Sequence, residues 1–299
     1  MIEKFEDIVN TVKGEENKTI AVAMAQDEDA ILAVKKSKDE GIADAVLVGD
    51  EQKIKSILEK QNIPAGTFQI VHVEGEREAI KEAISLIRKG DANVLMKGKC
   101  SSANYLRGIL DKEHGLREGD VLSHLAVFEV ETYKKLILMS DAALNIYPDL
   151  QAKIAITNNA ISAAHRLKID VPKVALITAI EKVNHEAMPC TADAAIISKM
   201  AQRGQIKGAE VDGPLAVDNA LSLKSCQVKG IKSSVGGDAD ILIMPNIETG
   251  NCFYKLMTTL CNSKSAGIIL GAQAPVVLPS RADSEDTKFY SIAVAMLIS

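Results

Sequence analysis

The sequence predicts an α/β protein with a doubly wound, mainly parallel sheet. Short apolar runs alternate with helical patterns along the chain, and this alternation is typical of βα units. The chain has 299 residues, more than one domain usually holds, so two domains or one large α/β domain are expected. With 47% hydrophobic and 25% charged residues, the chain can bury a sizeable core.

The first part of the chain follows the βα pattern closely. Apolar runs predict strands at residues 19–25, 43–48, 68–73 and 93–97, and periodic segments predict helices at 28–38, 51–60 and 77–89. Ser101 can cap a following helix, because Tyr105 and Ile109 share one helical face. Residues 122–130 and 136–139 are typical of an antiparallel pair of strands.

The pattern breaks at the proline in NIYPD, residues 145–149, and then starts again. Helices are predicted at 150–167, 191–203, 217–222, 249–260 and 285–298, and strands at 174–178, 210–211, 241–244 and 267–270. A first α/β domain is therefore expected to comprise residues 1–148 and 271–299, and a second one residues 149–270.

Charge and cysteine usage exclude several classes of protein. The net charge of −5 argues against general nucleic-acid binding, and no apolar run approaches the roughly 18 residues of a membrane span. The acidic start MIEKFEDIVN is unlike a signal peptide, so we expect a cytoplasmic protein. The five cysteines contain no CxxC pair, and no HExxH motif occurs, so we expect neither a disulfide framework nor a metal site.

The usual nucleotide motifs are also absent. The chain has no GxxxxGK[ST] and no GxGxxG, which argues against nucleotide hydrolysis and hydride transfer. Other glycines follow strands, in Lys97-Gly98-Lys99 and in Thr249-Gly250-Asn251. Backbone N–H groups at such turns can bind an oxyanion beside a lysine, although turn geometry alone also explains glycine there.

Three polar positions remain open between a structural and a functional interpretation. Asp212, in DGPL, either caps the next helix or faces a ligand at the carboxyl end of a strand. Arg107 lies beside an apolar helical face, so its guanidinium either reaches solvent or points into a cleft. The stretch PVVLPSRADSED turns abruptly from apolar to polar, which fits a solvated turn or a functional loop.

Taken together, several segments resemble the phosphate acetyl/butyryltransferase family. They are KGKCSSANYLRGIL, MSDAALNIYPD, EVDGPLAVDNAL, KGIKSSVGGDADILIMPNIETGNCFYKL and PVVLPSRADSED, which span Lys97 to Asp286 in the expected order. Within the family, the forms ADIL, AGIILGAQAPVVL and SRADS are more similar to phosphate butyryltransferase than to phosphate acetyltransferase.

The resemblance implies reversible acyl transfer between CoA and inorganic phosphate, with no metal and no redox cofactor. It also implies two three-layer α/β/α domains around a cleft, similar to isocitrate and isopropylmalate dehydrogenases, usually in a homodimer. Three alternatives remain: a phosphate acetyltransferase, a dehydrogenase of the same fold, and a binding protein that has lost the chemistry. No dehydrogenase metal or cofactor motif is found in the sequence.

The resemblance also implies a set of site residues. Ser280 and Arg281 match the family's active-site serine and arginine, and Arg107 matches the arginine of its serine-rich turn and helix. The carboxylate that serves as thiol base matches Asp286 only with a one-residue gap, so Asp283 competes for this role. The residues expected to bind substrate are Lys97, Ser101, Asp212, Gly250, Asn251 and Asp283.

Overall fold

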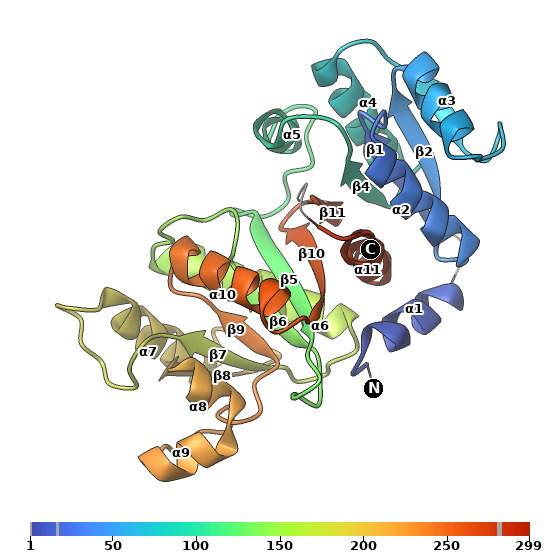
Figure 1. Cartoon of the computed structure of the whole chain (residues 1–299). Helices are drawn as coiled ribbons and strands as arrows, with labels where there is room; N and C mark the ends of the chain where they lie inside the picture. The colour runs from blue at the N-terminus through green and yellow to red at the C-terminus, as the bar shows by residue number, and fades with distance from the viewer. Residues whose placement is uncertain (1, 16–17, 280–282) are drawn as a thin grey trace. The chain divides into compact units, whose positions relative to one another are not determined.

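A computed structural model of the whole chain describes residues 2–15, 18–279 and 283–299 (Figure 1). The chain forms two compact units. The N-terminal unit comprises Phe5–Asp120 and Ser265–Ser299, and the central unit comprises Met1–Lys4 and Val121–Lys264.

The limits of these units differ from the expected domain boundaries at 148/149 and 270/271. The strands β5 (Ser123–Glu129) and β6 (Ile137–Ser140) precede the proline break, yet β6 pairs in parallel with β9 (Ile241–Ile243) of the central unit. Hydrogen bonding between strands distant in sequence therefore decides the division, and a proline break cannot reveal it.

The N-terminal unit follows the predicted βα pattern. Its helices are α1 (Phe5–Lys13), α2 (Glu28–Asp39), α3 (Glu51–Lys60), α4 (Glu76–Lys89), α5 (Ser102–Ile109) and α11 (Glu285–Ile298). Its strands are β1 (Lys18–Ala23), β2 (Ala43–Gly49), β3 (Gln69–His72), β4 (Val94–Lys97), β10 (Lys264–Leu270) and β11 (Val276–Val277). The strand order is β3-β2-β1-β4-β11-β10, and only β10 runs antiparallel to its neighbour β11.

Local sequence explains where these helices begin. The side chains of Asp27, Asp50 and Ser101 each accept a hydrogen bond from the backbone N–H of the third residue of α2, α3 and α5, respectively. The last helix, α11, is buried along almost its whole length because it packs against α1 and α2. This packing confirms the expectation of a final helix lying between other elements.

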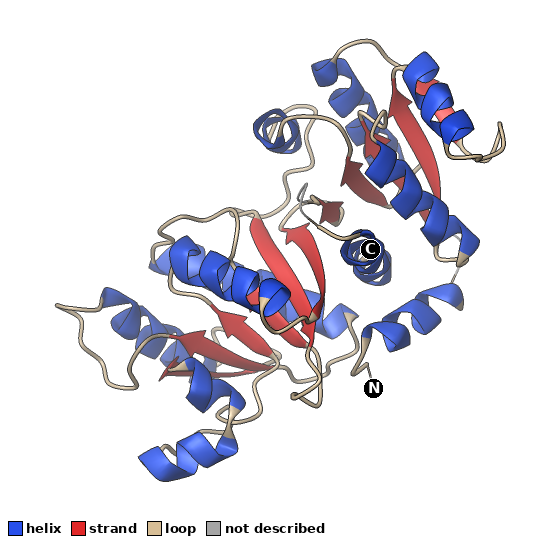
Figure 2. Cartoon of the chain, viewed as in Figure 1, coloured by secondary structure: helices blue, strands red, loops and turns tan. Residues whose placement is uncertain are grey.

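The central unit is a second α/β layer structure. Its remaining elements are α6 (Leu150–Arg166), β7 (Lys173–Ile177), α7 (Pro189–Gln202), β8 (Glu210–Leu215), α8 (Val217–Leu221), α9 (Leu223–Lys229) and α10 (Ile247–Thr259). The strand order is β5-β6-β9-β7-β8, and only β5 is antiparallel to its neighbour. Figure 2 shows the strands of each unit flanked by helices, as a doubly wound fold requires.

The central core shows the two-residue period of buried strands. Ile137 and Met139 of β6 pack with Tyr254 and Met257 of α10 in one hydrophobic cluster, whereas the intervening Leu138 is buried but does not belong to that cluster. The helices α6 and α7 contact the same sheet. Among the residues that the structure describes, no helix is long and apolar enough to cross a membrane.

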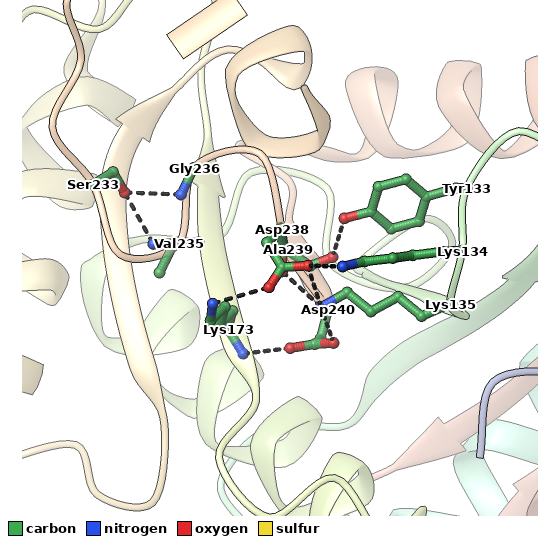
Figure 3. A network of polar contacts seen from close by, with 10 residues as sticks. All are labelled: Tyr133, Lys134, Lys135, Lys173, Ser233, Val235, Gly236, Asp238, Ala239 and Asp240. Atoms are coloured by element: carbon green, nitrogen blue, oxygen red, sulfur yellow. Dashed lines mark hydrogen bonds and ion pairs between the residues drawn. The ribbon is translucent and has the colours of Figure 1, made fainter. Parts of the chain in front are cut away.

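A network of lysines and aspartates ties together the amino ends of three central strands (Figure 3). Asp240, just before β9, accepts hydrogen bonds from the backbone N–H of Lys173 at 2.7 Å and pairs with Lys135 at 2.7 Å. Asp238 pairs with Lys173 at 2.9 Å and with Lys135 at 3.1 Å, and Lys134 lies 3.3 Å away. These contacts join residues that lie at or just before the start of β6, β7 and β9.

The electrostatic balance of the network favours the carboxylate of Asp238. Burial opposes its charged form, but hydrogen bonds from Lys173 and Lys135 outweigh that effect and lower the pKa of Asp238 from 3.8 to about 2. A carboxyl group whose pKa is lower in the folded state stabilises the fold above its unfolded pKa. That stabilisation is lost as the pH falls from about 4 towards 2.

We expect Asp238→Asn to lower the free energy of unfolding at pH 7, because it removes the charge that pairs with Lys173 and Lys135. The loss should be about 1 kcal/mol, because the carboxylate is partly exposed and solvent weakens its ion pairs. The difference from wild type should shrink between pH 4 and pH 2, where wild-type Asp238 becomes protonated. Urea unfolding at several pH values measures both effects. Lys134→Gln is the control, because the Lys134 side chain is 78% exposed and should contribute less. Parallel pH curves for wild type and Asp238→Asn would contradict the assignment.

Candidate functional site

The carboxyl ends of the parallel strands in the N-terminal unit carry several of the predicted residues. The chain reverses its direction across the sheet between β1 and β4, and such a reversal is where open α/β sheets usually bind ligands. Lys97 ends β4 there, and Gly98 follows it. A Cβ atom on Gly98 would lie 2.3 Å from the carbonyl oxygen of Met24, so only glycine permits the two strand ends to come this close.

The amino end of α5 lies at the same edge, and the carboxylate of Glu76 is hydrogen-bonded to it. Ser101 caps the helix by accepting a hydrogen bond from the Asn104 N–H at 3.1 Å. The Glu76 carboxylate accepts hydrogen bonds from the Ser101 N–H at 3.2 Å and the Asn104 amide at 2.8 Å. The Asn104 hydrogen bond leads the interactions that lower the pKa of Glu76. An anionic substrate bound at this helix end would therefore compete with Glu76.

Cys100 lies between these residues but is poorly suited to act as a nucleophile. Burial raises the pKa of its thiol from 9.0 to about 11, although nearby Lys97 acts in the opposite direction. The thiol is therefore protonated at neutral pH. Among the described residues, no group of three or more His, Cys, Asp or Glu side chains is arranged to hold a metal ion.

The Arg107 side chain is exposed on α5 and lies at a surface hollow, which agrees with both interpretations given above. Its guanidinium donates a hydrogen bond to Asn104 and lines a hollow of about 320 Å³ between α4 and α5. Arg77 and Lys81 of α4 line the same hollow. Arg107 thus belongs to a basic depression on this unit.

The predicted Ser280 and Arg281 lie outside the described residues. They follow β11, whose Val277 pairs with Met96 of β4, so the described chain leading to them runs beside the strand that ends at Lys97. Beyond them, Asp283 offers its backbone carbonyl to the Lys288 ammonium at 3.1 Å. Lys288, which is buried, also pairs with Asp29 of α2 at 3.0 Å.

Asp286 lies in the first turn of α11, where it is 69% exposed and pairs with Lys36 of α2 at 2.8 Å. The hydrogen bond from Lys36 to Asp286 is the main cause that raises the pKa of the lysine. The described contacts of Asp286 are therefore those of a surface ion pair. Any role in proton transfer requires the carboxylate to exchange this partner for the thiol.

In the central unit, Gly250 and Asn251 lie together at the start of α10, against the turn that follows β6. A Cβ atom on Gly250 would lie 2.1 Å from the Asp141 carbonyl oxygen, so glycine is needed for close packing. Asn251 donates a hydrogen bond to the Ala142 carbonyl oxygen at 3.1 Å. Both residues thus hold α10 against the Asp141 turn.

Asp141 is the residue that the sequence analysis missed at this position. Its buried carboxylate accepts hydrogen bonds from the backbone N–H groups of His124, Ala143 and Leu144 at 2.7–2.9 Å, and from the Asn145 amide at 2.7 Å. An Asp that binds N–H groups two and three residues ahead forms an Asx-turn, which the pattern SDAALN could have indicated. Lys288, which is buried at the end of the polar first turn of α11, was also not predicted.

The structure contradicts the helix-cap interpretation of Asp212, whereas its binding of a ligand stays a prediction. The strand β8 continues through DGPL to Leu215, so Asp212 lies within the strand and the next helix begins after Ala216. Pro214 is tolerated because β8 is an edge strand. Asp212 accepts hydrogen bonds from the Gly213 N–H at 2.8 Å and the Ser198 hydroxyl at 3.4 Å, away from the carboxyl end of its strand.

Comparison with known proteins settles the family. A family model described as phosphate acetyl/butaryl transferase matches residues 4–84 and 77–296. The chain belongs to this family. The chain is 49% identical over 299 residues to a phosphate butyryltransferase from Clostridium acetobutylicum, covering 100% of this chain and 99% of that protein.

Solved structures agree with the family and the fold. A branched-chain phosphotransacylase from Enterococcus faecalis V583 aligns with a TM-score of 0.83 and 33% identity, over 94% of this chain and 98% of that one. A 4-hydroxythreonine-4-phosphate dehydrogenase from Klebsiella pneumoniae aligns with a TM-score of 0.57 and 14% identity, over 94% and 99% of the two chains, which concerns the fold alone. The expected dehydrogenase-like α/β fold is thereby confirmed.

We expect Gly250→Ala to lower the free energy of unfolding by roughly 1–3 kcal/mol, because the added methyl group overlaps backbone atoms that cannot rotate away. Urea unfolding measures the change. Cys252→Ala is the matched control on the same helix, since Cys252 is exposed and its substitution should change stability by less than about 0.5 kcal/mol. A Gly250→Ala protein as stable as the control would show that α10 can move away from the Asp141 turn at no cost.

Proposed function

We propose that this family member transfers a short acyl group, butyryl or a branched one, reversibly between CoA and inorganic phosphate. The full-length similarity to a phosphate butyryltransferase carries this proposal, because it extends over both units of the chain. The structural likeness to a branched-chain phosphotransacylase favours branched acyl groups as well. Transfer of acetyl is the second candidate, because the description of the family includes both acetyl and butyryl transfer.

The reaction makes three demands on the protein. In the direction that forms the thioester, the CoA thiol, with an ordinary pKa near 8.5, must lose its proton before sulfur attacks the carbonyl carbon of the acyl phosphate. The new C–S bond forms, the carbonyl oxygen becomes an oxyanion, and the C–O bond to phosphate then breaks. Fixed hydrogen-bond donors and cations are needed where the two negative charges develop.

Arginine and serine side chains supply those donors in the proposal. Arg281 and Arg107 hold the phosphoryl group, because a guanidinium stays charged and offers two parallel hydrogen bonds to phosphate oxygens. Ser280 donates a hydrogen bond to the carbonyl oxygen or to the phosphate. The position of Lys97 at the carboxyl end of β4 supports a further cationic role for its ammonium group in binding the anionic substrate.

The remaining predicted binding residues have supporting roles in the proposal. Ser101 binds substrate only if Glu76 gives up the amino end of α5. Gly250 and Asn251 act by fixing the start of α10 against the Asp141 turn. Asp212 has the weakest support, because it lies within an edge strand.

Asp286 is proposed as the base that removes the thiol proton, with Asp283 as the alternative. The Lys36 ion pair positions the Asp286 side chain, but the carboxylate must leave this cation before it can accept a proton. Asp283 is closer in the chain to Arg281 and is less exposed than Asp286. Substitution of each carboxylate in turn therefore decides which of the two acts as the base.

The proposal also includes the state in which the enzyme works. Acyl transfer between sulfur and phosphate involves no net oxidation or reduction, so it needs no redox cofactor, and in this proposal it needs no metal ion. We propose a cytoplasmic homodimer that acts on acyl-CoA and phosphate and binds neither nucleic acid nor membrane. Size-exclusion chromatography with light scattering tests the dimer, and dialysis against a chelator tests the independence from metal.

We expect phosphate-dependent release of free thiol from butyryl-CoA or isobutyryl-CoA to exceed release from acetyl-CoA. A thiol-reactive dye measures this release. Arg281→Ala should lower turnover by at least about 10²-fold with the fold retained, because it removes a cation from the developing charge. Dominant acetyl turnover would favour the second candidate, and an inert protein would overturn acyl transfer altogether.

We expect Asp286→Asn to lower turnover by about 10²-fold or more, the usual effect of losing a general base. Lys36→Met is the matched control, because it breaks the same ion pair but leaves the carboxylate in place. Equal losses in the two variants would mean that the ion pair matters only for structure. An active Asp286→Asn protein and an inactive Asp283→Asn protein would move the role of base to Asp283.

A further inference from the structure

We propose that Lys288 is a positioning residue for the acyl transfer, because its ammonium group fixes the backbone of Asp283, a candidate for the thiol base. Lys288 touches no substrate in this proposal and acts only through the Asp283 carbonyl group. The proposal rests on the acyl-transfer function proposed above. It adds a residue to which neither the motifs nor the family resemblance assigned a role.

The Lys288 ammonium group is buried and joins two separate segments of the N-terminal unit. The Lys288 side chain is 7% exposed, and its Nζ atom donates a hydrogen bond to the backbone carbonyl oxygen of Asp283 at 3.1 Å. The same Nζ atom pairs with the Asp29 carboxylate at 3.0 Å. Asp29 lies in the first turn of α2, whereas Asp283 precedes Ser284, the cap of α11. Lys288 therefore ties the chain just before α11 to another helix.

The requirements of the helix α11 do not explain a lysine at this position. Lys288 is the fourth residue of α11, near the amino end, where the helix dipole disfavours a cation. Phe289 and Ile292 beside it are buried and apolar, so an apolar side chain would suit the same packing. Burying a charge removes it from water, and apolar side chains of similar volume are often as stabilising. The contacts that Lys288 makes explain it better than helix stability does.

The carbonyl group that Lys288 holds belongs to the peptide unit between Asp283 and Ser284. A fixed peptide unit restricts the path of the chain before it, because only two backbone torsions per residue can vary. Arg281 precedes Asp283 by two residues in the sequence. Before that stretch, Val277 is held by the pairing of β11 with β4. Lys288 thus supplies an anchor on the helix side of the residues assigned to the chemistry.

Loss of this anchor should affect the chemical step more than substrate binding. A displacement of a catalytic group by about 1 Å can lower turnover by about 10²-fold, even when the substituted residue is remote from the reacting atoms. Loss of an interaction that acts only in the transition state lowers kcat without raising KM. A lysine with a purely structural role would instead change stability and leave the kcat of the folded protein unchanged.

The first experiment compares Lys288→Met with Lys18→Met in the phosphate-dependent release of thiol from butyryl-CoA. Lys18 is the matched control, because its ammonium group donates a hydrogen bond to the Met296 carbonyl oxygen at 2.7 Å, near the other end of α11, and pairs with Glu15 at 3.1 Å. We expect Lys288→Met to lower kcat by about tenfold or more and to change the KM for butyryl-CoA by less than about threefold. Lys18→Met should keep the wild-type kcat. Urea unfolding of both variants measures any loss of stability separately.

Asp29→Asn separates the two contacts of Lys288, because it removes the charged partner on α2 and leaves the ammonium group beside Asp283. It should lower kcat by less than Lys288→Met does. An equal loss in Asp29→Asn would assign the effect to the ion pair between the helices and overturn the role of the Asp283 carbonyl group. Lys288→Gln is the second variant if Lys288→Met does not fold, and the same split between kcat and KM is expected of it.

Hydrogen exchange of the backbone amides in residues 283–287 tests the anchor without any turnover. These amides should exchange at least about threefold faster in Lys288→Met than in wild type, because the local structure opens more often, and Lys18→Met should leave them unchanged. Faster exchange in a protein that releases no thiol would support the anchor and refute acyl transfer. Thiol release by the wild type with an undiminished kcat in Lys288→Met would overturn the positioning role and leave acyl transfer standing.

Discussion

The rest of the structure depends on one constraint, the hydrogen bonding of parallel strands connected through helices. Parallel pairing places the carboxyl ends of neighbouring strands at one edge, and each connecting helix begins at that edge. Lys97 and the amino end of α5 lie there in the N-terminal unit, and the Asp141 turn and the amino end of α10 lie there in the central unit. Each sheet therefore gathers its polar groups without needing them to be adjacent in sequence.

Close backbone contact gives these edges their shape. Gly98 allows the turn after β4 to approach Met24, and Gly250 allows α10 to approach Asp141. Any side chain at either glycine would push apart two segments whose backbones are otherwise in contact. The carboxylate of Asp141 then satisfies four donors in a turn that would otherwise bury unpaired N–H groups, which is costly. Both glycines thus act through packing, whatever they contribute to binding.

The ion pairs of the described residues occur in both units. In the central unit, Lys135 and Lys173 are matched by Asp238 and Asp240, so that network is nearly neutral and serves the sheet. In the N-terminal unit, the cations between α4 and α5 have no such partners among the described residues.

The sequence by itself determined the elements of the fold and the family. Hydrophobic periodicity and side-chain caps are local properties, so the expected helices and strands agree with the structure to within a few residues, as in α3 and α11. The short helices α1 and α9 were not predicted from the sequence. The roles of Ser280 and Arg281 stay predictions, since they fall outside the described residues.

Only the tertiary structure decided which residues meet. It placed β5 and β6 in the central unit, extended β8 past Asp212, paired Asp286 with Lys36, and set Glu76 at the amino end of α5. Each of these depends on contacts between segments far apart in the chain, and local periodicity carries no information about such contacts. The same reason explains why the neighbours of Arg107 could not be predicted: Arg77 and Lys81 lie on another helix, and only packing brings the three together.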